Sequence, residues 1–357
     1  MVGRGQALRR AVRGDRALTR SHPSDNVSRT VRDPHARLLA DVGGTNARFG
    51  WQRQRSAPID DIAVLPCADH ASLSDAIAAY LLQLGRAAPA SCAIAIANPI
   101  VGDIVRMTNR DWTFSIAALK AHFAFERLQV MNDFTALALA LPALRADELR
   151  QIGGGPALPN EARALIGPGT GLGVSGLLPD GAGGWVALQG EGGHATLAAR
   201  TAREQSVLQW FEQRYGHVSA ERAVCGQGLP DLYNALTALD DLIDKGQAAP
   251  SPDAAQIAVA AAQGDAVCRE AVMLFCAFLG TVAGNLALTL GSRGGVYVGG
   301  GIVPRLGALF DASPFRERFE DKGRFRSYLA AMPVFVITAA QSPALLGAAN
   351  ALDSMPA

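Results

Sequence analysis

The sequence is poor in the features that mark several classes of protein. It has 5 cysteines among 357 residues, at positions 67, 92, 225, 268 and 276, and no two of them form a CxxC pair. An odd number of scattered cysteines argues against a disulfide framework or a zinc cluster, and predicts reduced thiols in the core of a cytoplasmic protein. The apolar runs are broken by glycine or charge before the roughly 18 residues that a membrane helix needs. No membrane span is therefore predicted.

Basic charge is scarce outside the first segment of the chain. The formal net charge is +1, yet residues 1–37 hold nine arginines against three aspartates, so the remainder is net negative. A chain without a basic excess offers no surface for nucleic acid there. Residues 1–36 lack a sustained apolar period and the apolar core of a secretory signal, which predicts a disordered Arg-rich tail.

Glycine is abundant, at 38 residues, and 49% of the chain is hydrophobic. This composition predicts a large core with many tight turns, and the length favours two domains.

The first glycine-rich turn lies in residues 38–50, which read LLADVGGTNARFG. An apolar strand, a polar tip and a second alternating strand predict a β-hairpin. Glycines let the backbone approach a bulky anion such as a phosphate, and short side chains add donors. The predicted anion contacts are Gly43, Gly44, Thr45 and Asn46. Asp41 would face the same anion through a divalent cation. Taken alone, the tip is equally an ordinary hairpin turn.

A second turn of this kind lies in residues 164–176, which read ALIGPGTGLGVSG. Its four glycines, 167, 169, 171 and 173, would free a run of amides to point one way, and Thr170 adds a hydroxyl. No GK[ST] follows, so the turn is not a Walker loop, and a strand in place of a helix excludes the dinucleotide fingerprint. The predicted contacts are Gly169, Thr170 and Gly171.

A third block, residues 294–307, reads GGVYVGGGIVPRLG. Bare backbone at Gly299, Gly300 and Gly301 would allow a flat ring such as adenine to lie against it. The alternative is a plain turn between a strand and a helix.

The acidic candidate of most interest lies in residues 127–142, which read RLQVMNDFTALALALP. A strand gives way to a helix, so Asn132 and Asp133 fall at the helix entrance. Phosphoryl transfer to a hydroxyl needs one group to receive the proton, and Asp133 suits that task. It also suits an N-cap, and the two roles are compatible. The positive helix end would keep Asp133 ionised and lower its proton affinity.

Taken in order, DVGGTN, NDF, GPGTGLG, GEGGH and VGGG resemble the sugar-kinase/Hsp70/actin superfamily, and most closely its bacterial ATP-dependent glucokinase family. The resemblance runs from about residue 37 to the end of the chain. It implies an α/β, two-lobed actin-like ATPase (ribonuclease H-like) fold, in which each lobe is a mixed sheet with helices and a cleft lies between. The expected domains are a small one of residues 37–143 plus 338–357 and a large one of 144–337.

The resemblance also implies the chemistry, which is transfer from MgATP to the 6-hydroxyl of glucose. The residues expected around the hexose are Asn132, Asp133, Glu191, His194 and Glu221. Asp41 would hold Mg²⁺ through water. Glu221 could equally form an ordinary ion pair with its neighbour Arg222. Asn98, Asn109 and Trp112 are expected to shape the cleft wall.

Further expectations concern partners and rival functions. The alanine-rich helix predicted at 265–290 and the family resemblance favour a homodimer. One alternative is the same chemistry on mannose or an N-acetyl amino sugar. Another is a non-catalytic sugar-sensing regulator, which the presence of Asp41, Asp133 and Thr170 disfavours. The related repressor group usually carries a CxCGxxGC zinc motif, and this sequence has none.

Overall fold

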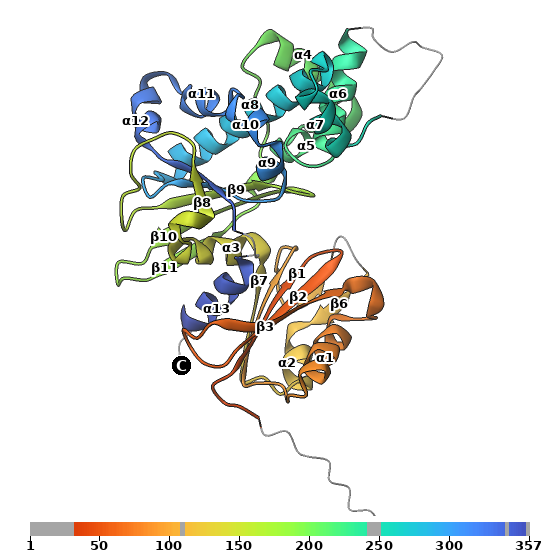
Figure 1. The fold of residues 1–357 in the computed structure, drawn as a ribbon, viewed down its shortest axis with the longest axis vertical. Helices are drawn as coiled ribbons and strands as arrows, with labels where there is room; N and C mark the ends of the chain where they lie inside the picture. Colours follow the sequence, from red (N-terminus) through yellow and green to blue (C-terminus); the bar gives the residue numbers. More distant parts are fainter. Residues whose placement is uncertain (1–31, 108–110, 241–250, 340–342, 355–357) are drawn as a thin grey trace, which may run out of the picture.

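The computed structural model describes residues 32–107, 111–240, 251–339 and 343–354, so most of the predicted tail and Asn109 lie outside it. Within these ranges the strands form two large mixed sheets and one small hairpin. Figure 1 shows each large sheet in a lobe of its own, with its own helices. The domain boundaries themselves stay a prediction.

The small lobe is built on a sheet of order β3-β2-β1-β4-β7. Its strands are β1 (Arg37–Val42), β2 (Asn46–Gln52), β3 (Ile59–Pro66), β4 (Ser91–Ile96) and β7 (Arg127–Asn132). The helices α1 (Leu73–Leu84) and α2 (Ile116–His122) cover one face, together with the hairpin of β5 (Ile104–Arg106) and β6 (Thr113–Ser115). Strands place alternate residues on opposite faces, so Leu38 packs towards α1 while Leu39 packs against α13 (Ala344–Ser354).

The large lobe repeats this pattern in a sheet of order β11-β10-β9-β12-β13-β8. Its strands are β8 (Leu149–Gln151), β9 (Arg163–Pro168), β10 (Leu172–Pro179), β11 (Trp185–Gln189), β12 (Val296–Val298) and β13 (Val334–Ile337). In both sheets the first three strands are antiparallel and the next two pairings are parallel. Both predicted hairpins, β1–β2 and β9–β10, are confirmed and occupy equivalent places.

The remaining helices lie on the side of the large sheet that faces away from the small lobe (Figure 1). They are α4 (Ala202–Tyr215), α5 (Ala220–Ala223), α6 (Gly228–Leu239), α7 (Ala254–Ala262), α8 (Ala266–Leu290), α9 (Ile302–Leu306), α10 (Ala308–Asp311), α11 (Phe315–Glu320) and α12 (Arg326–Ala331). The five cysteines are free and buried, as predicted.

Helix α8 is the one candidate membrane span among the described residues. It is long and apolar enough to cross a membrane by length and composition, but 67% of its apolar window is buried inside the protein. Its side chains, among them Phe275 and Phe278, form the core of the large lobe. A buried core helix meets the same criteria of length and composition, so these criteria are only weak evidence for a membrane span. Whether α8 takes part in a homodimer stays a prediction.

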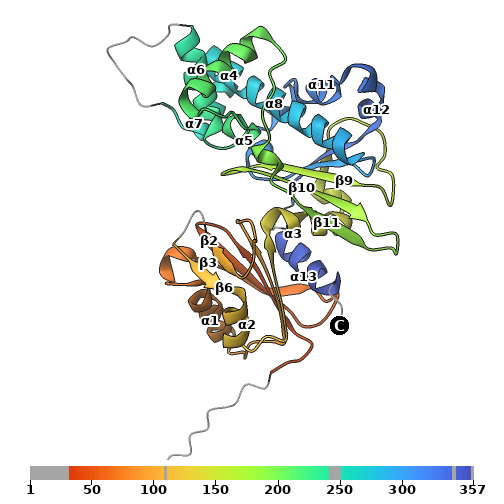
Figure 2. The ribbon, with the colours of Figure 1, turned by 180° about the vertical axis from the view of Figure 1, so that it is seen from behind.

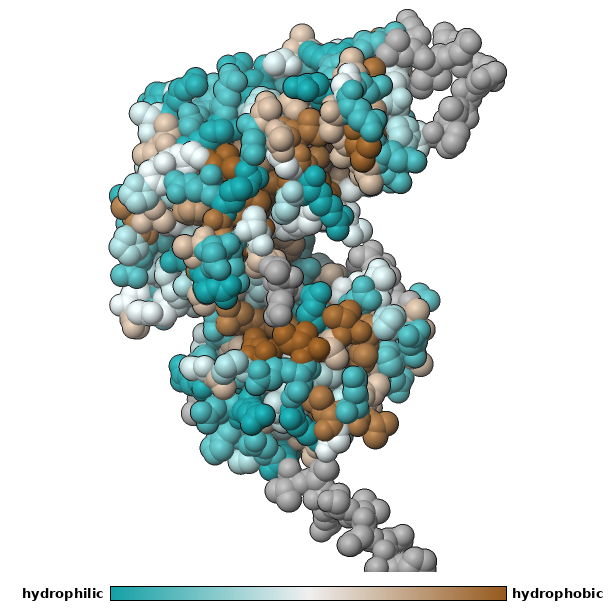
Figure 3. All heavy atoms as spheres, in the orientation of Figure 1, coloured by the Kyte–Doolittle hydropathy of each residue, from teal (hydrophilic) through white to brown (hydrophobic). Residues whose placement is uncertain are grey.

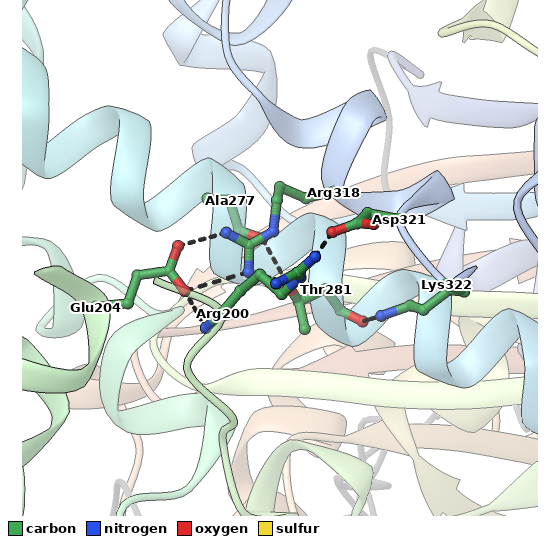
Figure 4. Close-up of polar contacts among 7 residues, drawn as sticks. All are labelled: Arg200, Glu204, Ala277, Thr281, Arg318, Asp321 and Lys322. Carbon is green, nitrogen blue, oxygen red and sulfur yellow. Dashed lines mark hydrogen bonds and ion pairs between the residues drawn. The ribbon is translucent and has the colours of Figure 1, made fainter. Parts of the chain in front are cut away.

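A polar cluster ties α4, α8 and α11 together (Figure 4). The Glu204 carboxylate pairs with the Arg318 guanidinium, which also donates to Thr281 Oγ1 at 2.9 Å. Glu204 Oε2 accepts the backbone N–H of Arg200 at 2.6 Å. Glu204 is 2% exposed, and its charge is matched by a cation and hydrogen bonds. The cluster therefore fixes the positions of three helices of the large lobe relative to one another.

Two helices lie between the sheets, as Figures 1 and 2 show from opposite sides. They are α3 (Asp133–Ala140), which follows β7, and α13, by which the chain returns to the small lobe. Their close crossing depends on Gly347, where a Cβ atom would collide with the Ala136 carbonyl. Ala138 on α3 packs with Leu165 and Leu177 of the large sheet. Thus α3 touches both lobes, and its first residues lie where they meet.

Candidate active site

A cavity of about 600 Å³ lies between the two lobes. The surface is visibly notched at this level in the space-filling view (Figure 3). The parallel strands β1, β4 and β7 all end at it, which is where ligands bind in sheets of this kind. The predicted residues that line it are Gly43, Gly44, Asn98, Asn132, Asp133, Gly169, Thr170, Gly171, Glu191, His194, Glu221 and Gly300.

Asp133 is the first residue of α3, and Asn132 caps the helix. Asn132 Oδ1 accepts the N–H groups of Phe134 at 2.8 Å and of Thr135 at 3.3 Å. The alternative that Asp133 is the N-cap is therefore wrong. Its carboxylate is left facing the cavity, with the Phe134 N–H donating to Oδ1 at 2.9 Å.

The electrostatic expectation for Asp133 is also wrong. Burial raises its pKa to about 6, with further increases from the charges of Asp41 and Glu191. The backbone N–H groups at the helix start act in the opposite direction but are outweighed. A carboxyl group with a pKa near neutrality accepts a proton more readily than an ordinary aspartate, so Asp133 is a better general base than the helix position suggested.

The three other predicted sugar contacts gather on the large-lobe side of the cavity. Glu191 immediately precedes the short 3₁₀ turn Gly192–His194, and His194 Nδ1 lies 3.9 Å from Glu221 Oε1. Glu221, in the first turn of α5, accepts the Leu172 N–H at 2.8 Å, so α5 is fastened to the second hairpin. Its neighbour Arg222 lies over the Tyr215 ring, 4.4 Å from its centroid. Glu221 is thus turned towards the cavity and away from Arg222.

The glycines of the second hairpin have several roles rather than one. A Cβ atom at Gly169 would meet open space, and the Gly169 N–H donates to the Gly171 carbonyl at 2.8 Å. At Gly171 a Cβ atom would collide with the Glu221 carboxylate, so glycine is needed there to seat that side chain. Gly167 and Gly173 leave room for the Phe134 ring. Contacts between the amides of this turn and an anion stay a prediction.

The first hairpin and the third block are only partly at the cavity. Thr45 and Asn46 are exposed and do not line it. The Asn46 carbonyl closes the turn by accepting the Gly43 N–H, and the Thr45 carbonyl accepts the N–H of Cys67, which follows β3. Gly299 is buried against Leu137, and Gly301 lies outside the lining. Contacts between these four residues and a nucleotide stay predictions.

Asp41 lies at the end of β1 and accepts a hydrogen bond from Arg48 at 3.2 Å. It is not among the residues that line the cavity, but its charge acts on Asp133. Among the described residues, no group of three or more His, Cys, Asp or Glu side chains forms a ready-made metal cage.

Comparison with known proteins agrees with this geometry. A model of the glucokinase family matches residues 38–355. A glucokinase of Chromobacterium violaceum is 54% identical over 315 residues, which is 88% of each chain.

The chain belongs to the glucokinase family.

Among solved structures, a glucokinase from an Antarctic psychrotroph matches with a TM-score of 0.80 and 37% identity, covering 90% of this chain and 99% of that one. A ROK family glucokinase from Streptomyces griseus has the same fold, with a TM-score of 0.59 at 18% identity over 88% and 98% of the two chains. These findings confirm the predicted family, the two-lobed actin-like fold and the enzyme class, a hexose kinase.

For Trp112 and Phe134 the structure of this glucokinase-family protein differs from what the sequence indicated. Trp112 is 4% exposed in the small-lobe core, and its indole N–H donates to the His70 carbonyl at 3.2 Å, so it does not line the cavity. Phe134 does line it and was missed. The available signal was the pair of glycines inside strands β9 and β10, since glycine within a strand often marks a close approach.

Proposed function

We propose that this chain transfers the γ-phosphoryl group of ATP to the 6-hydroxyl of glucose, giving glucose 6-phosphate and ADP. The observation that carries the proposal is the Asp133 carboxylate, with a pKa of about 6, at a cavity edged by one glycine hairpin from each lobe. Family membership supports the same reaction.

In the proposed reaction Asp133 receives the proton of the attacking hydroxyl as the new bond from oxygen to phosphorus forms and the bond to ADP breaks. Asn132, whose side-chain N–H donates to the Asn98 carbonyl at 3.4 Å, would fix the sugar beside it. Glu191, His194 and Glu221 would hold the other hydroxyls. Groups that each bind a particular hydroxyl discriminate between sugars, because a misplaced hydroxyl leaves a buried partner unpaired.

The nucleotide would lie with its phosphates between Gly43–Gly44 and Gly169–Gly171, and its base against Gly300. The Streptomyces griseus protein of the same fold was solved in complex with glucose and AMPPNP. The negative charges of Asp41 and Glu191 both act on the Asp133 carboxylate and raise its pKa. That excess of negative charge fits a divalent cation, and we propose Mg²⁺ held by the phosphates and, in part through water, by Asp41. When bound, Mg²⁺ would neutralise charge that develops on the transferred group.

The test is a steady-state assay of the purified chain with glucose, mannose and N-acetylglucosamine, and with ATP, ADP and polyphosphate as donors. The proposal predicts the largest kcat/KM for glucose with MgATP. A larger value for another hexose would move the assignment to that sugar. Glucose that binds without transfer in a single-turnover experiment would instead indicate a sensor.

We also propose a cytoplasmic location and a homodimer, both from the family resemblance alone. Size-exclusion chromatography with light scattering tests the second. A mass equal to one chain of 37.3 kDa would contradict the dimer.

A further inference from the structure

Phe134 follows Asp133 at the start of α3, and its ring lies on the β9–β10 hairpin of the other lobe. A Cβ atom built on Gly167 would lie 2.7 Å from Phe134 Cζ, and one built on Gly173 would lie closer still to the opposite edge of the ring. Gly167 and Gly173 are partners across the two strands. The ring therefore covers the one pair of facing residues in this hairpin that both lack a side chain.

The backbone of Phe134 contacts the carboxylate itself. Its N–H donates to Asp133 Oδ1 at 2.9 Å and to Asn132 Oδ1 at 2.8 Å. The side chain meanwhile packs with the cluster that contains Leu165 and Tyr297 of the large sheet. One residue thus joins the proposed base, through its main chain, to the hairpin that carries residues 169–171, through its ring.

We propose that Phe134 is a positioning residue that sets the Asp133 carboxylate at a fixed distance from the phosphate-binding turn of the large lobe. The inference rests on the proposed function, because it assumes that Asp133 and residues 169–171 act on the same phosphoryl group. The two arrive from different lobes, so some contact must fix their separation. A misplacement of about 1 Å between reacting groups can cost about a hundredfold in rate.

This role gives Gly167 and Gly173 a specific function. Glycine inside a strand weakens it, so a reason is needed for two of them facing each other. A larger residue at either position would displace the Phe134 ring, and Phe134 directly follows Asp133 in the chain. The strain would reach the carboxylate with no flexible side chain between to absorb it.

The test begins with Gly173→Ala, whose methyl group displaces the Phe134 ring. We expect kcat to fall about tenfold to a hundredfold, while the glucose KM changes about threefold or less, because the other proposed sugar contacts, Glu191, His194 and Glu221, stay in place. Phe134→Leu alone should also lower kcat. The double variant, in which leucine leaves room for the methyl group, should recover about fivefold or more of the kcat lost in Gly173→Ala. A structural role without positioning would not give this rescue.

Two matched controls separate positioning from stability. Phe211→Leu removes the same ring from a fully buried site in α4, and should lower Tm without lowering kcat. Gly155→Ala adds a methyl group at ordinary contact distance, 3.4 Å from the Ala331 carbonyl, and should change neither.

Three results would overturn the inference. They are a Gly173→Ala enzyme with wild-type kcat, losses that multiply in the double variant without rescue, and, should Gly173→Ala fail to fold, a Phe134→Leu enzyme with the kcat of Phe211→Leu. A wild-type enzyme that does not phosphorylate glucose would overturn the proposed function first. The wild-type assay therefore tells the two failures apart.

Discussion

Glu204 and Asp133 are two carboxylates largely removed from solvent, and they differ in how their negative charge is compensated. Glu204 in the large lobe is paired with Arg318 and accepts the Arg200 N–H. Asp133 at the cavity is hydrogen-bonded to backbone N–H groups, and the charges that act on it, from Asp41 and Glu191, are negative. Glu204 stabilises the fold. The environment of Asp133 favours binding a proton, at a cost in stability.

The comparison shows that burial alone does not identify a functional residue. A buried charge with a matched partner is a structural feature. Removing that partner would leave an unpaired buried ion, which destabilises the fold. A carboxylate left among like charges beside a cavity has an altered pKa and room for a ligand. Both properties together mark a candidate catalytic group.

The largest expected effect is on catalysis by Asp133→Asn. Amide in place of carboxylate cannot take the proton, so kcat should fall by about 10² to 10⁴. Glucose affinity, measured by calorimetry, should change only a few-fold because the amide keeps an acceptor oxygen. Glu204→Gln is the matched change at the other carboxylate, and its folded fraction should keep the wild-type kcat. Equal losses of kcat in both variants would break the comparison.

The second effect concerns the paired carboxylate. Arg318→Leu leaves Glu204 charged and buried, and should reduce the free energy of unfolding by about 3–5 kcal/mol. Urea denaturation measures it. Adding Glu204→Met in the same chain should restore much of the loss, because no unpaired charge is then left. A single variant as stable as the wild type would show that the pair contributes little.

How much of this could be read from the sequence depends on how local each feature is. Both hairpins follow from alternation and glycine, and the helix entrance at Asn132 and Asp133 follows from the change of period. The choice of Asn132 as the cap is a competition between two good capping residues that sequence does not decide. The raised pKa of Asp133 depends on burial and on Asp41 and Glu191, which come from distant parts of the chain.

The same reason limits what can be said of the glycines. Whether a glycine serves a phosphate or an aromatic ring is decided by what the other lobe places against it, as at Gly173.

A smaller effect is the pH dependence of kcat/KM, which reports groups in the free enzyme. With a pKa of about 6, Asp133 is protonated below that pH and loses its function as a base. The expected profile is flat above pH 7 and falls about tenfold per unit below the pKa of Asp133. As controls, saturation by glucose and by MgATP is measured at each pH. A plateau that extends to pH 4.5 would mean that Asp133 keeps an ordinary pKa.

The smallest effect is on stability, and its sign opposes that of the Glu204 site. The folded pKa of Asp133 lies above the usual value of about 3.9, so its stabilising contribution is complete below pH 4 and lost as the pH rises through 6. At pH 8 Asp133→Asn should therefore stabilise the protein, by on the order of 1–2 kcal/mol. The gain should shrink at pH 5. Thermal unfolding at the two pH values tests this, and a destabilised variant at pH 8 would contradict it.

The most direct test of the central claim is a crystal structure with glucose and a non-hydrolysable ATP analogue bound. The account predicts the sugar 6-hydroxyl within hydrogen-bond distance of the Asp133 carboxylate, and the terminal phosphate between Gly43–Gly44 and Gly169–Gly171. A hexose whose 6-hydroxyl faces away from Asp133, or phosphates that touch neither glycine turn, would contradict it.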